Sequence, residues 1–577
     1  MKIVVLVVMF AALIGAACAP AAQPAAAPAA QPAAPAAPKA PAQPQAPAPA
    51  AAAVQPQLPA PAAVPKAEEP KEAAAKPKYG GRVIVPHGSD WPHFDPHLNI
   101  SNTTQWRASL HYLRLVTKEP RKDVYDVHIV PDAAERWDIS ADALEYTFYL
   151  RKGMKWARVE PLNARELTSD DVVYSFERAL SPVNVARGKY AALKKVEALD
   201  KYTVKFTLRQ KDSRFLDVLT HDPSWIVPKE MIEKHGDLKN VGAGAGPFIL
   251  DKADKSIGTF HKKNPDYYDA NKVYLDYHDI PLIPDKATAL AAFRAGKVDI
   301  LGTWGIGVNK QELEGLLKTN PETQWVGMIR PSVGSQLWLR FGTEPFNDLK
   351  VRKALNHAIN RDAMLKALYQ GQGQYQGYVA SAYPGFVLAQ DELKLYLKYD
   401  PALSRKLLAE AGYPKGFKTN VMWNKSGSSS AVELYQQFFK DVGVELDLQA
   451  QAVDYPKWVT DVYQGNFPQL GAAGGIVEGA LTTIYAFNHT KGERNGPKSS
   501  VPKIDELIDK AIATLDVKEQ EKLVKEAQRV LLTEVLWNLP CCETPSYDAW
   551  QPWVNNYRTY STGIYTRDMY WYVWLNK

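Results

Sequence analysis

The stretch Leu339–Leu365, LRFGTEPFNDLKVRKALNHAINRDAML, predicts a strand, a turn and a helix in that order. Up to Phe341 the apolar side chains alternate with the period of two that is typical of a strand. Glycine and proline at positions 342 and 345 mark the turn. Asn347 or Asp348 can accept backbone N–H groups at the start of the helix that follows.

That helix carries one apolar stripe, formed by Val351, Leu355, Ala358 and Ile359. The spacing of three and four residues places these side chains on one face, which we expect to be buried. Replacing Leu355 with alanine is therefore expected to cost about 2–5 kcal/mol of stability. Asn356 falls on another face, so Asn356→Ala is expected to cost little.

The pattern PF-x-D-x-x-VR-x-AL-x-x-AI-x-R, which includes Asp348 and Arg361, resembles the signature of the family 5 extracellular solute-binding proteins. These are the peptide, nickel and related receptors of ABC importers. Further motifs resemble the same family in the same order along residues 79–577: Phe94-Asp95-Pro96-His97, Gly244-Ala245-Gly246-Pro247-Phe248, Asn264-Pro265-Asp266-Tyr267-Tyr268 and Ala295–Ile300. Single motifs of this kind are weak, whereas the ordered series is specific.

The resemblance implies an α/β fold with the two-lobed architecture of type II periplasmic binding proteins, an additional small domain, and mixed sheets flanked by helices. Alternating strands and helices along the chain indicate the same class. The implied domains are a discontinuous lobe I at residues 79–116, 197–330 and 541–577, a small second domain at 117–196, and lobe II at 331–540. Within the small domain, Ser169-Asp170-Asp171 is expected to cap a helix whose stripe is Val172, Val173, Phe176 and Leu180.

Length and composition agree with a large, multidomain protein. At 577 residues the chain exceeds what one hydrophobic core usually serves. Its net charge of +6 is spread over the chain without a lysine- or arginine-rich block, which argues against a nucleic-acid partner. Three cysteines cannot form a disulfide framework, and Cys541 and Cys542 are expected to be small buried residues.

The amino terminus is typical of an exported protein. Lys2 precedes the apolar run Ile3–Ala17, which is shorter than a membrane-spanning helix and predicts a signal peptide within residues 1–18. The small residues before Cys18 resemble a bacterial lipoprotein signal, although Gly15 stands where leucine is usual. We therefore expect a lipid anchor on Cys18 and an extracytoplasmic location, with ordinary signal cleavage as the alternative.

The segment Ala19–Lys78 consists largely of alanine and proline and has no pattern of large apolar residues. It cannot bury a core, so it is predicted to be a disordered tether between the anchor and the folded body. The expected partners are a small-molecule or peptide ligand, the permease subunits of an ABC importer, and the membrane through the anchor. The protein is expected to be a monomer.

No recognisable catalytic signature is present: there is no GxSxG, HExxH, CxxC, Walker A or dinucleotide fingerprint. A glycoside hydrolase needs only two carboxylates, which no motif reveals, so a secreted carbohydrate-active enzyme is a distant alternative. His87, His93 and His97 could be metal ligands, but the intervening prolines prevent a helix from aligning them. We expect neither a metal nor another cofactor.

Peptide receptors of this family resemble one another in having an aromatic residue followed by an aspartate that pairs with the ligand's ammonium group. Tyr455 fits the aromatic position. At the aspartate position an ungapped match places Val477, with Glu478 one residue later. Without a carboxylate there, burial of the ammonium would be costly, so a non-peptide solute such as an oligosaccharide is the alternative to an oligopeptide.

The candidate ligand-binding residues are polar or aromatic side chains and glycines in predicted loops: Ser101, Trp304, Trp423, Asn424, Tyr455, Trp458, Gly474, Gly475 and Glu478. Aromatic rings can stack on sugars and on peptide side chains. Each ring could equally belong to the core, and the sequence does not distinguish the two roles.

Overall fold

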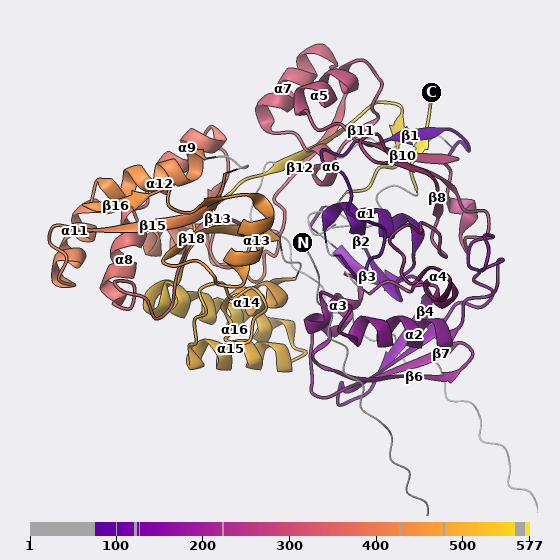
Figure 1. The fold of residues 1–577 in the computed structure, drawn as a ribbon, viewed down its shortest axis with the longest axis horizontal. Helices are drawn as coiled ribbons and strands as arrows, with labels where there is room; N and C mark the ends of the chain where they lie inside the picture. Colours follow the sequence, from indigo (N-terminus) through magenta and orange to yellow (C-terminus); the bar gives the residue numbers. More distant parts are fainter. Residues whose placement is uncertain are drawn as a thin grey trace, which may run out of the picture. The chain divides into compact units, whose positions relative to one another are not determined.

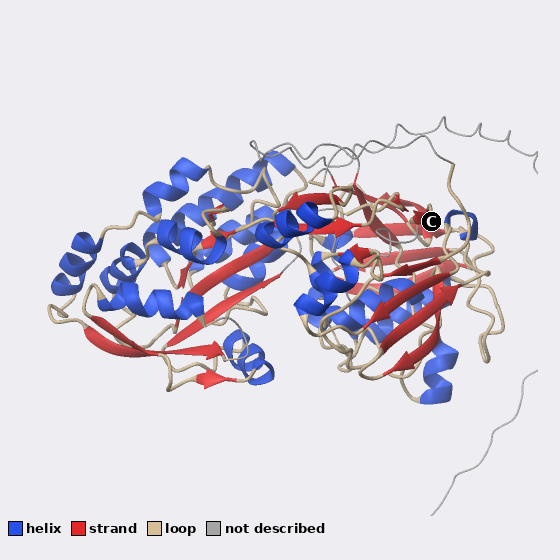
Figure 2. Ribbon diagram, turned by 90° about the horizontal axis from the view of Figure 1, so that it is seen from above, coloured by secondary structure: helices blue, strands red, loops and turns tan. Residues whose placement is uncertain are grey.

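The computed structural model describes residues 76–99, 101–120, 124–125, 127–221, 224–425, 429–476, 479–559 and 572–577. All of them belong to the unit Pro56–Lys577. The predicted signal with Cys18, and residues 19–75 of the predicted tether, lie outside the described residues. Among the helices that are described, none is both long and apolar enough to cross a membrane. Figure 1 labels the elements, and Figure 2 shows helices and strands interspersed throughout, as expected of the α/β class.

The amino-terminal and middle parts of the chain share a four-stranded sheet. Its order is β1 (Arg82–Ile84), β10 (Tyr277–Pro281), β9 (Gly258–Lys263) and β8 (Phe248–Asp254). β1 is parallel to β10, and the other neighbours are antiparallel. A second sheet joins β11 (Ile300–Leu301), β21 (Ser546–Trp550) and β12 (Gln324–Met328). The carboxyl-terminal strand β21 thus returns to the part of the chain predicted to form lobe I.

The helices around these sheets are α1 (Asn102–His111), α5 (Lys286–Arg294), α6 (Thr303–Ile306) and α7 (Lys310–Thr319). Short two-stranded ladders pair β2 (Val116–Pro120) with β3 (Val127–Pro131), β14 (Gln374–Tyr375) with β20 (Cys542–Glu543), and β22 (Val554–Asn555) with β23 (Trp574–Leu575). Cys541 and Cys542 are buried and not disulfide-bonded, as the sequence predicts.

An antiparallel sheet forms most of the predicted small domain. Its order is β4 (Ala134–Ile139), β5 (Glu145–Leu150), β7 (Thr203–Leu208) and β6 (Leu193–Asp200). The helices α2 (Ser169–Leu180), α3 (Phe215–Leu219) and α4 (Lys229–His235) accompany it. The predicted boundary between residues 196 and 197 lies inside β6, whereas a boundary after β7 would keep this sheet whole. The division into domains is otherwise a prediction.

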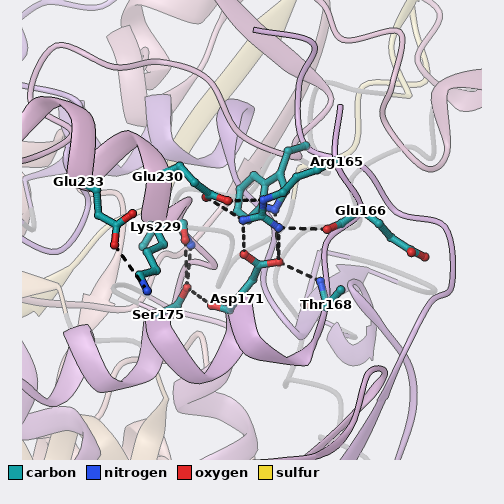
Figure 3. Close-up of polar contacts among 10 residues, drawn as sticks. Arg165, Glu166, Thr168, Asp171, Ser175, Lys229, Glu230 and Glu233 are labelled. Atoms are coloured by element: carbon teal, nitrogen blue, oxygen red, sulfur yellow. Dashed lines mark hydrogen bonds and ion pairs between the residues drawn. The ribbon is translucent and has the colours of Figure 1, made fainter. Parts of the chain in front are cut away.

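Arg165 connects the start of α2 to α4 (Figure 3). Its guanidinium donates to both carboxylate oxygens of Asp171, at 2.6 and 2.9 Å, and also to Glu230. Asp171 in turn accepts from the backbone N–H of Thr168 at 2.9 Å, completing a capping box. The cap of α2 is therefore Thr168, one residue before the predicted Ser169–Asp171 cap.

The largest sheet occupies the part predicted to be lobe II. Its order is β16 (Val444–Asp447), β15 (Phe417–Asn424), β18 (Leu470–Ile476), β13 (Ser332–Leu339) and β19 (Asn538–Leu539), and β17 (Ala452–Val453) also pairs with β15. β15 is parallel to β16, β17 and β18, whereas β13 is antiparallel to β18 and β19. The sheet is therefore mixed.

Most helices of the structure accompany this sheet. They are α8 (Leu349–Ala358), α9 (Arg361–Tyr369), α10 (Gln390–Tyr396), α11 (Pro401–Glu410), α12 (Ser430–Lys440), α13 (Tyr455–Tyr463), α14 (Ala480–Asn488), α15 (Pro502–Ala513) and α16 (Val517–Val530).

The predicted strand is present as β13, which ends at Leu339 rather than Phe341, and the predicted helix is α8, which ends at Ala358, so that a second helix, α9, begins at Arg361. Asp348 is the cap of α8 and accepts from the backbone N–H of Lys350 at 2.7 Å. The predicted apolar stripe is fully buried: Val351, Leu355, Ala358 and Ile359. This part of the prediction is confirmed. Side chains spaced by three and four residues share one face of a helix, and a single packed layer is enough to bury that face.

The prediction for Asn356 is wrong, because its side chain is only 1% exposed. Its amide donates to the carbonyl oxygen of Tyr396 at 3.0 Å, and its Oδ1 accepts from Arg361 at 2.7 Å. Arg361 is itself fully buried and also donates to the carbonyl oxygens of Pro540 and Leu397. A second side of α8 is thus covered by segments distant in sequence, which the helical pattern does not reveal.

Candidate ligand-binding site

Three parallel strands end at one edge of the largest sheet. Trp423 and Asn424 of β15 pair with Ala452 and Val453 of β17, and Met422 pairs with Gly471 of β18. The chain then enters α12 after β15, α13 after β17, and α14 after β18. Ligands of open α/β sheets bind outside the carboxyl ends of parallel strands, where helix N-termini supply unpaired N–H groups. This strand edge is therefore the candidate ligand-binding site.

The structure brings several predicted residues to the strand edge. Asn424 is the last residue of β15, and Gly474 and Gly475 lie near the end of β18. Tyr455 is the first residue of α13, and Trp458 lies one turn later. The side chains of Tyr455 and Trp304, and the whole of Glu478, lie outside the described residues, so their predicted roles remain predictions.

Ser101 is the exception, because it belongs to a different part of the fold. It is the cap of α1, and its side chain accepts from the backbone N–H of Thr104 at 3.4 Å. Its Oγ also lies 3.1 Å from the hydroxyl oxygen of Thr103. These contacts are local to its own helix and account for a hydroxyl residue at this position.

Both tryptophans at the strand edge are tied to backbone carbonyls. The indole of Trp423 donates to Leu448 at 2.7 Å, and that of Trp458 donates to Ala472 of β18 at 2.8 Å. Trp423 packs on the main core of this region, and Trp458 packs on a smaller cluster with Trp338 and Phe487. Each ring is half-buried, so it anchors its element and leaves part of its surface exposed.

The two glycines of β18 allow another side chain to approach the strand. The hydroxyl of Tyr463 donates to the carbonyl oxygen of Gly474 and occupies the space that a Cβ on Gly475 would need. The guanidinium of Arg494 lies 5.2 Å from the centre of the Tyr463 ring. Sequence reasoning missed Tyr463 and Arg494, although paired glycines inside a strand signal such a close approach.

The first turn of α14 meets residues from distant parts of the chain. Its cap, Gly479, has a φ of 82°, and its N–H donates to the hydroxyl of Tyr383 at 2.6 Å. Asp217 of α3 lies beside it, because a Cβ built on Gly479 would be 2.7 Å from the Asp217 Oδ2. The Asp217 carboxylate therefore lies beside Gly479, the residue that follows the loop in which the family's aspartate is expected.

Asp217 is held by Lys118 of β2, whose ammonium lies 2.7 Å from its Oδ1. The same ammonium lies 2.7 Å from Nε2 of the buried His221. Burial lowers the pKa of His221 well below its usual value, and the charge of Lys118 lowers it further, so this imidazole is neutral at pH 7. No motif marks this trio in the sequence, because Lys118 lies about a hundred residues before Asp217 and His221, which are four residues apart.

The described residues contain no group of three or more histidine, cysteine, aspartate or glutamate side chains that could hold a metal ion. A cavity of about 390 Å³ lies beside β2 and β3, and none of the predicted ligand-binding residues lines it. Of its charged lining residues, Asp269 pairs with Lys272 at 2.7 Å, Glu119 pairs with Arg558 at 3.2 Å, and Arg151 donates to the carbonyl oxygen of Asp132 at 2.7 Å. We therefore consider the strand edge the stronger candidate.

Comparison with known proteins agrees with this architecture. The model of the bacterial extracellular solute-binding proteins, family 5 middle, matches residues 128–495. The chain is 30% identical over 499 residues to heme-binding protein A of Haemophilus influenzae, covering 80% of this chain and 87% of that protein. It is 28% identical over 474 residues to the glutathione-binding protein GsiB of Escherichia coli, covering 79% of this chain and 88% of that protein.

A solved structure with the same fold is the periplasmic binding protein DppA of Helicobacter pylori, in complex with the peptide STSA. It matches with a TM-score of 0.74 and 26% identity, over 87% of this chain and 99% of that one. The predicted fold class, a two-lobed type II periplasmic-binding-protein architecture, is thereby confirmed. The chain belongs to the family 5 extracellular solute-binding proteins, the substrate-binding proteins of ABC importers.

Proposed function

We propose that this protein is an extracytoplasmic, non-enzymatic receptor that binds an oligopeptide reversibly and delivers it to an ABC permease. The observation that carries the proposal is the strand edge, where Asn424, Gly474 and Gly475 meet the start of α13 and α14. Family membership and a fold shared with a peptide-bound protein support the same conclusion.

The chemistry of the strand edge suits a ligand with polar ends. Helix N-termini present backbone N–H groups and a partial positive charge, which favour a carboxylate. A peptide's ammonium end needs an acidic partner. Glu478 is the partner proposed from the sequence, and Asp217, beside Gly479, is the acidic side chain that the structure adds to that neighbourhood.

Isothermal titration calorimetry with separate probes tests the ligand class. The probes are the tetrapeptide Ser-Thr-Ser-Ala, reduced glutathione, hemin and a mixture of maltooligosaccharides. Binding of the tetrapeptide, recovered with unchanged mass, would support a peptide receptor without turnover. Binding of hemin or an oligosaccharide alone would overturn the peptide assignment, and a hydrolysed product would overturn the non-enzymatic one.

Two variants identify the anchor of a bound peptide. Glu478→Gln should lower the affinity for Ser-Thr-Ser-Ala by about 1.5–3 kcal/mol if that carboxylate pairs with the ammonium. Glu493→Gln is the matched control, because Glu493 is an exposed acid after α14. An unchanged affinity in Glu478→Gln would remove Glu478 from the site. Tyr455→Ala tests the aromatic position in the same assay.

We also propose that Cys18 carries a lipid and that residues 19–78 tether the body to the membrane. Metabolic labelling with a palmitate analogue should mark the wild-type protein and not Cys18→Ala. Label in the variant would overturn the anchor. A single peak of monomer mass in light scattering would support the monomeric state proposed here.

A further inference from the structure

Residues 212–217, between β7 and the middle of α3, contact two helices that belong to another part of the chain. Ser213 donates its backbone N–H to the carbonyl oxygen of Ile512 in α15 at 3.0 Å. The guanidinium of Arg214 lies 4.5 Å from the centre of the Tyr485 ring in α14. Asp217 lies against Gly479, at the start of α14.

Two of these contacts lie at helix ends. The last carbonyl groups of a helix have no partner within it, and the Ser213 N–H takes one of them in α15. The second contact is at a helix N-terminus: the Asp217 carboxylate lies at the start of α14, where a negative charge is stabilised. The segment thus offers a donor to a helix C-terminus and an acid to a helix N-terminus.

The Arg214 contact is rigid on both sides. Asp212 holds the guanidinium through two hydrogen bonds of 2.9 and 2.7 Å, and the two side chains are only 15% and 5% exposed. The Tyr485 ring is stacked on His489 with 4.5 Å between ring centres. A cation fixed over an aromatic face in a partly desolvated place contributes more than an exposed one.

The two sides of this contact fall in different predicted lobes. Residues 212–217 belong to the part predicted as lobe I, and α14 and α15 belong to the part predicted as lobe II. The chain crosses between these parts near residues 330 and 540, so the contact closes a long loop in sequence. In addition, α14 begins directly after the loop that follows β18 at the strand edge.

We propose that residues 212–217 form a closing latch, which holds the two predicted lobes together over the strand edge and releases when they open. The proposal rests on the proposed function, since it assumes that the ligand binds at that edge. A ligand bound at the strand edge would favour the closed arrangement in which Asp217 meets Gly479. The latch in turn would raise the population of the closed, binding-competent state in the absence of ligand.

The latch can be tested without any ligand, in the full chain with Cys18→Ala. Spin labels at Leu199→Cys and Leu515→Cys, both 52% exposed in the native protein, report the distance between the two sides by pulsed electron resonance. Arg214→Ala should add a longer-distance population. Tyr485→Phe keeps the ring and should match the parent protein. Lys211→Ala, an exposed residue of the same loop, is the matched control.

An unchanged distance distribution in Arg214→Ala and in Asp217→Asn would overturn the latch, whatever the ligand proves to be. If Arg214→Ala fails to fold, Tyr485→Leu and Asp217→Asn decide in its place. With Ser-Thr-Ser-Ala as probe, the apparent affinity should fall about tenfold in Arg214→Ala, in proportion to the lost closed population. An altered distance without peptide binding would retain the latch and reject the peptide assignment.

Discussion

Helices α8 and α14 lie beside the same sheet, but their first turns are completed in different ways. In α8 the cap is local, because Asp348 accepts from the N–H of Lys350 two residues later. In α14 the cap is Gly479, which has no side chain, and its neighbours Tyr383 and Asp217 come from distant segments. The first turn of α8, which packs in the core, is capped by a neighbouring residue of the sequence. The first turn of α14, at the candidate site, is contacted instead by residues from distant segments.

Acid should produce the largest effect, through two buried histidines that lie outside both helices. His111 of α1 and His278 of β10 are fully buried, and burial lowers the pKa of each from 6.5 to about 3. The unfolded chain binds these protons first, so the stabilisation is complete above pH 6.5 and is lost as the pH falls toward 3. At pH 4.5 the loss is about 3 kcal/mol for each imidazole.

Urea unfolding at pH 7 and pH 4.5 measures this loss. His111→Leu should remove its own share of the pH dependence and retain that of His278, and His235→Gln, at an exposed imidazole, is the control. Equal pH dependence in His111→Leu and the parent would show that His111 does not titrate as its burial implies.

The apolar face of α8 should give the next largest effect. Leu355 is fully buried in the core, so Leu355→Ala should lower the free energy of unfolding by about 2–5 kcal/mol, through lost contacts and the cavity that remains. Denaturant unfolding with Lys353→Ala as the control measures the difference. A cost below that of the control would mean that the stripe does not face the core.

Asn356→Ala should come next, contrary to what the helical pattern predicts. The change removes the acceptor of Arg361 Nη2 and the donor to Tyr396, and leaves a buried guanidinium short of one partner. We expect a cost of about 1–3 kcal/mol. If Asn356→Ala proves as mild as Lys353→Ala, the hydrogen bond to Arg361 contributes nothing to stability.

Substitutions at the starts of α8 and α14 should have the smallest effects on stability. Only the substitution in α14 should depend on a distant residue, Asp217. Asp348→Ala should cost about 1 kcal/mol through the loss of a local cap. Gly479→Ala should cost about 1–2 kcal/mol, since its backbone conformation is unfavourable for alanine and its Cβ approaches Asp217. Part of the second cost should disappear in the double variant with Asp217→Ala. Fully additive free energies would show that Asp217 does not contact Gly479 in solution.

The candidate site was only partly open to prediction. Asn424, Gly474 and Gly475 were predicted, because loops after strands and paired glycines are visible in a single stretch of sequence. Lys118, Asp217 and Tyr383 were missed, since each lies in an ordinary strand, helix or loop and acquires its role from a partner elsewhere. Ser101 was predicted as a ligand-binding residue, and the structure shows that its hydroxyl caps α1.

Short-range elements and the family resemblance can be predicted from the sequence. The stripe from Val351 to Ile359 follows from helix periodicity, and the cap at Asp348 follows from a side chain that accepts a nearby backbone N–H, so both depend on a few neighbouring residues. The joint burial of Asn356 and Arg361, and the position of Asp217 at the start of α14, depend on contacts between distant segments. Burial and charge pairing depend on which segments cover a residue, and here those segments lie far away along the chain.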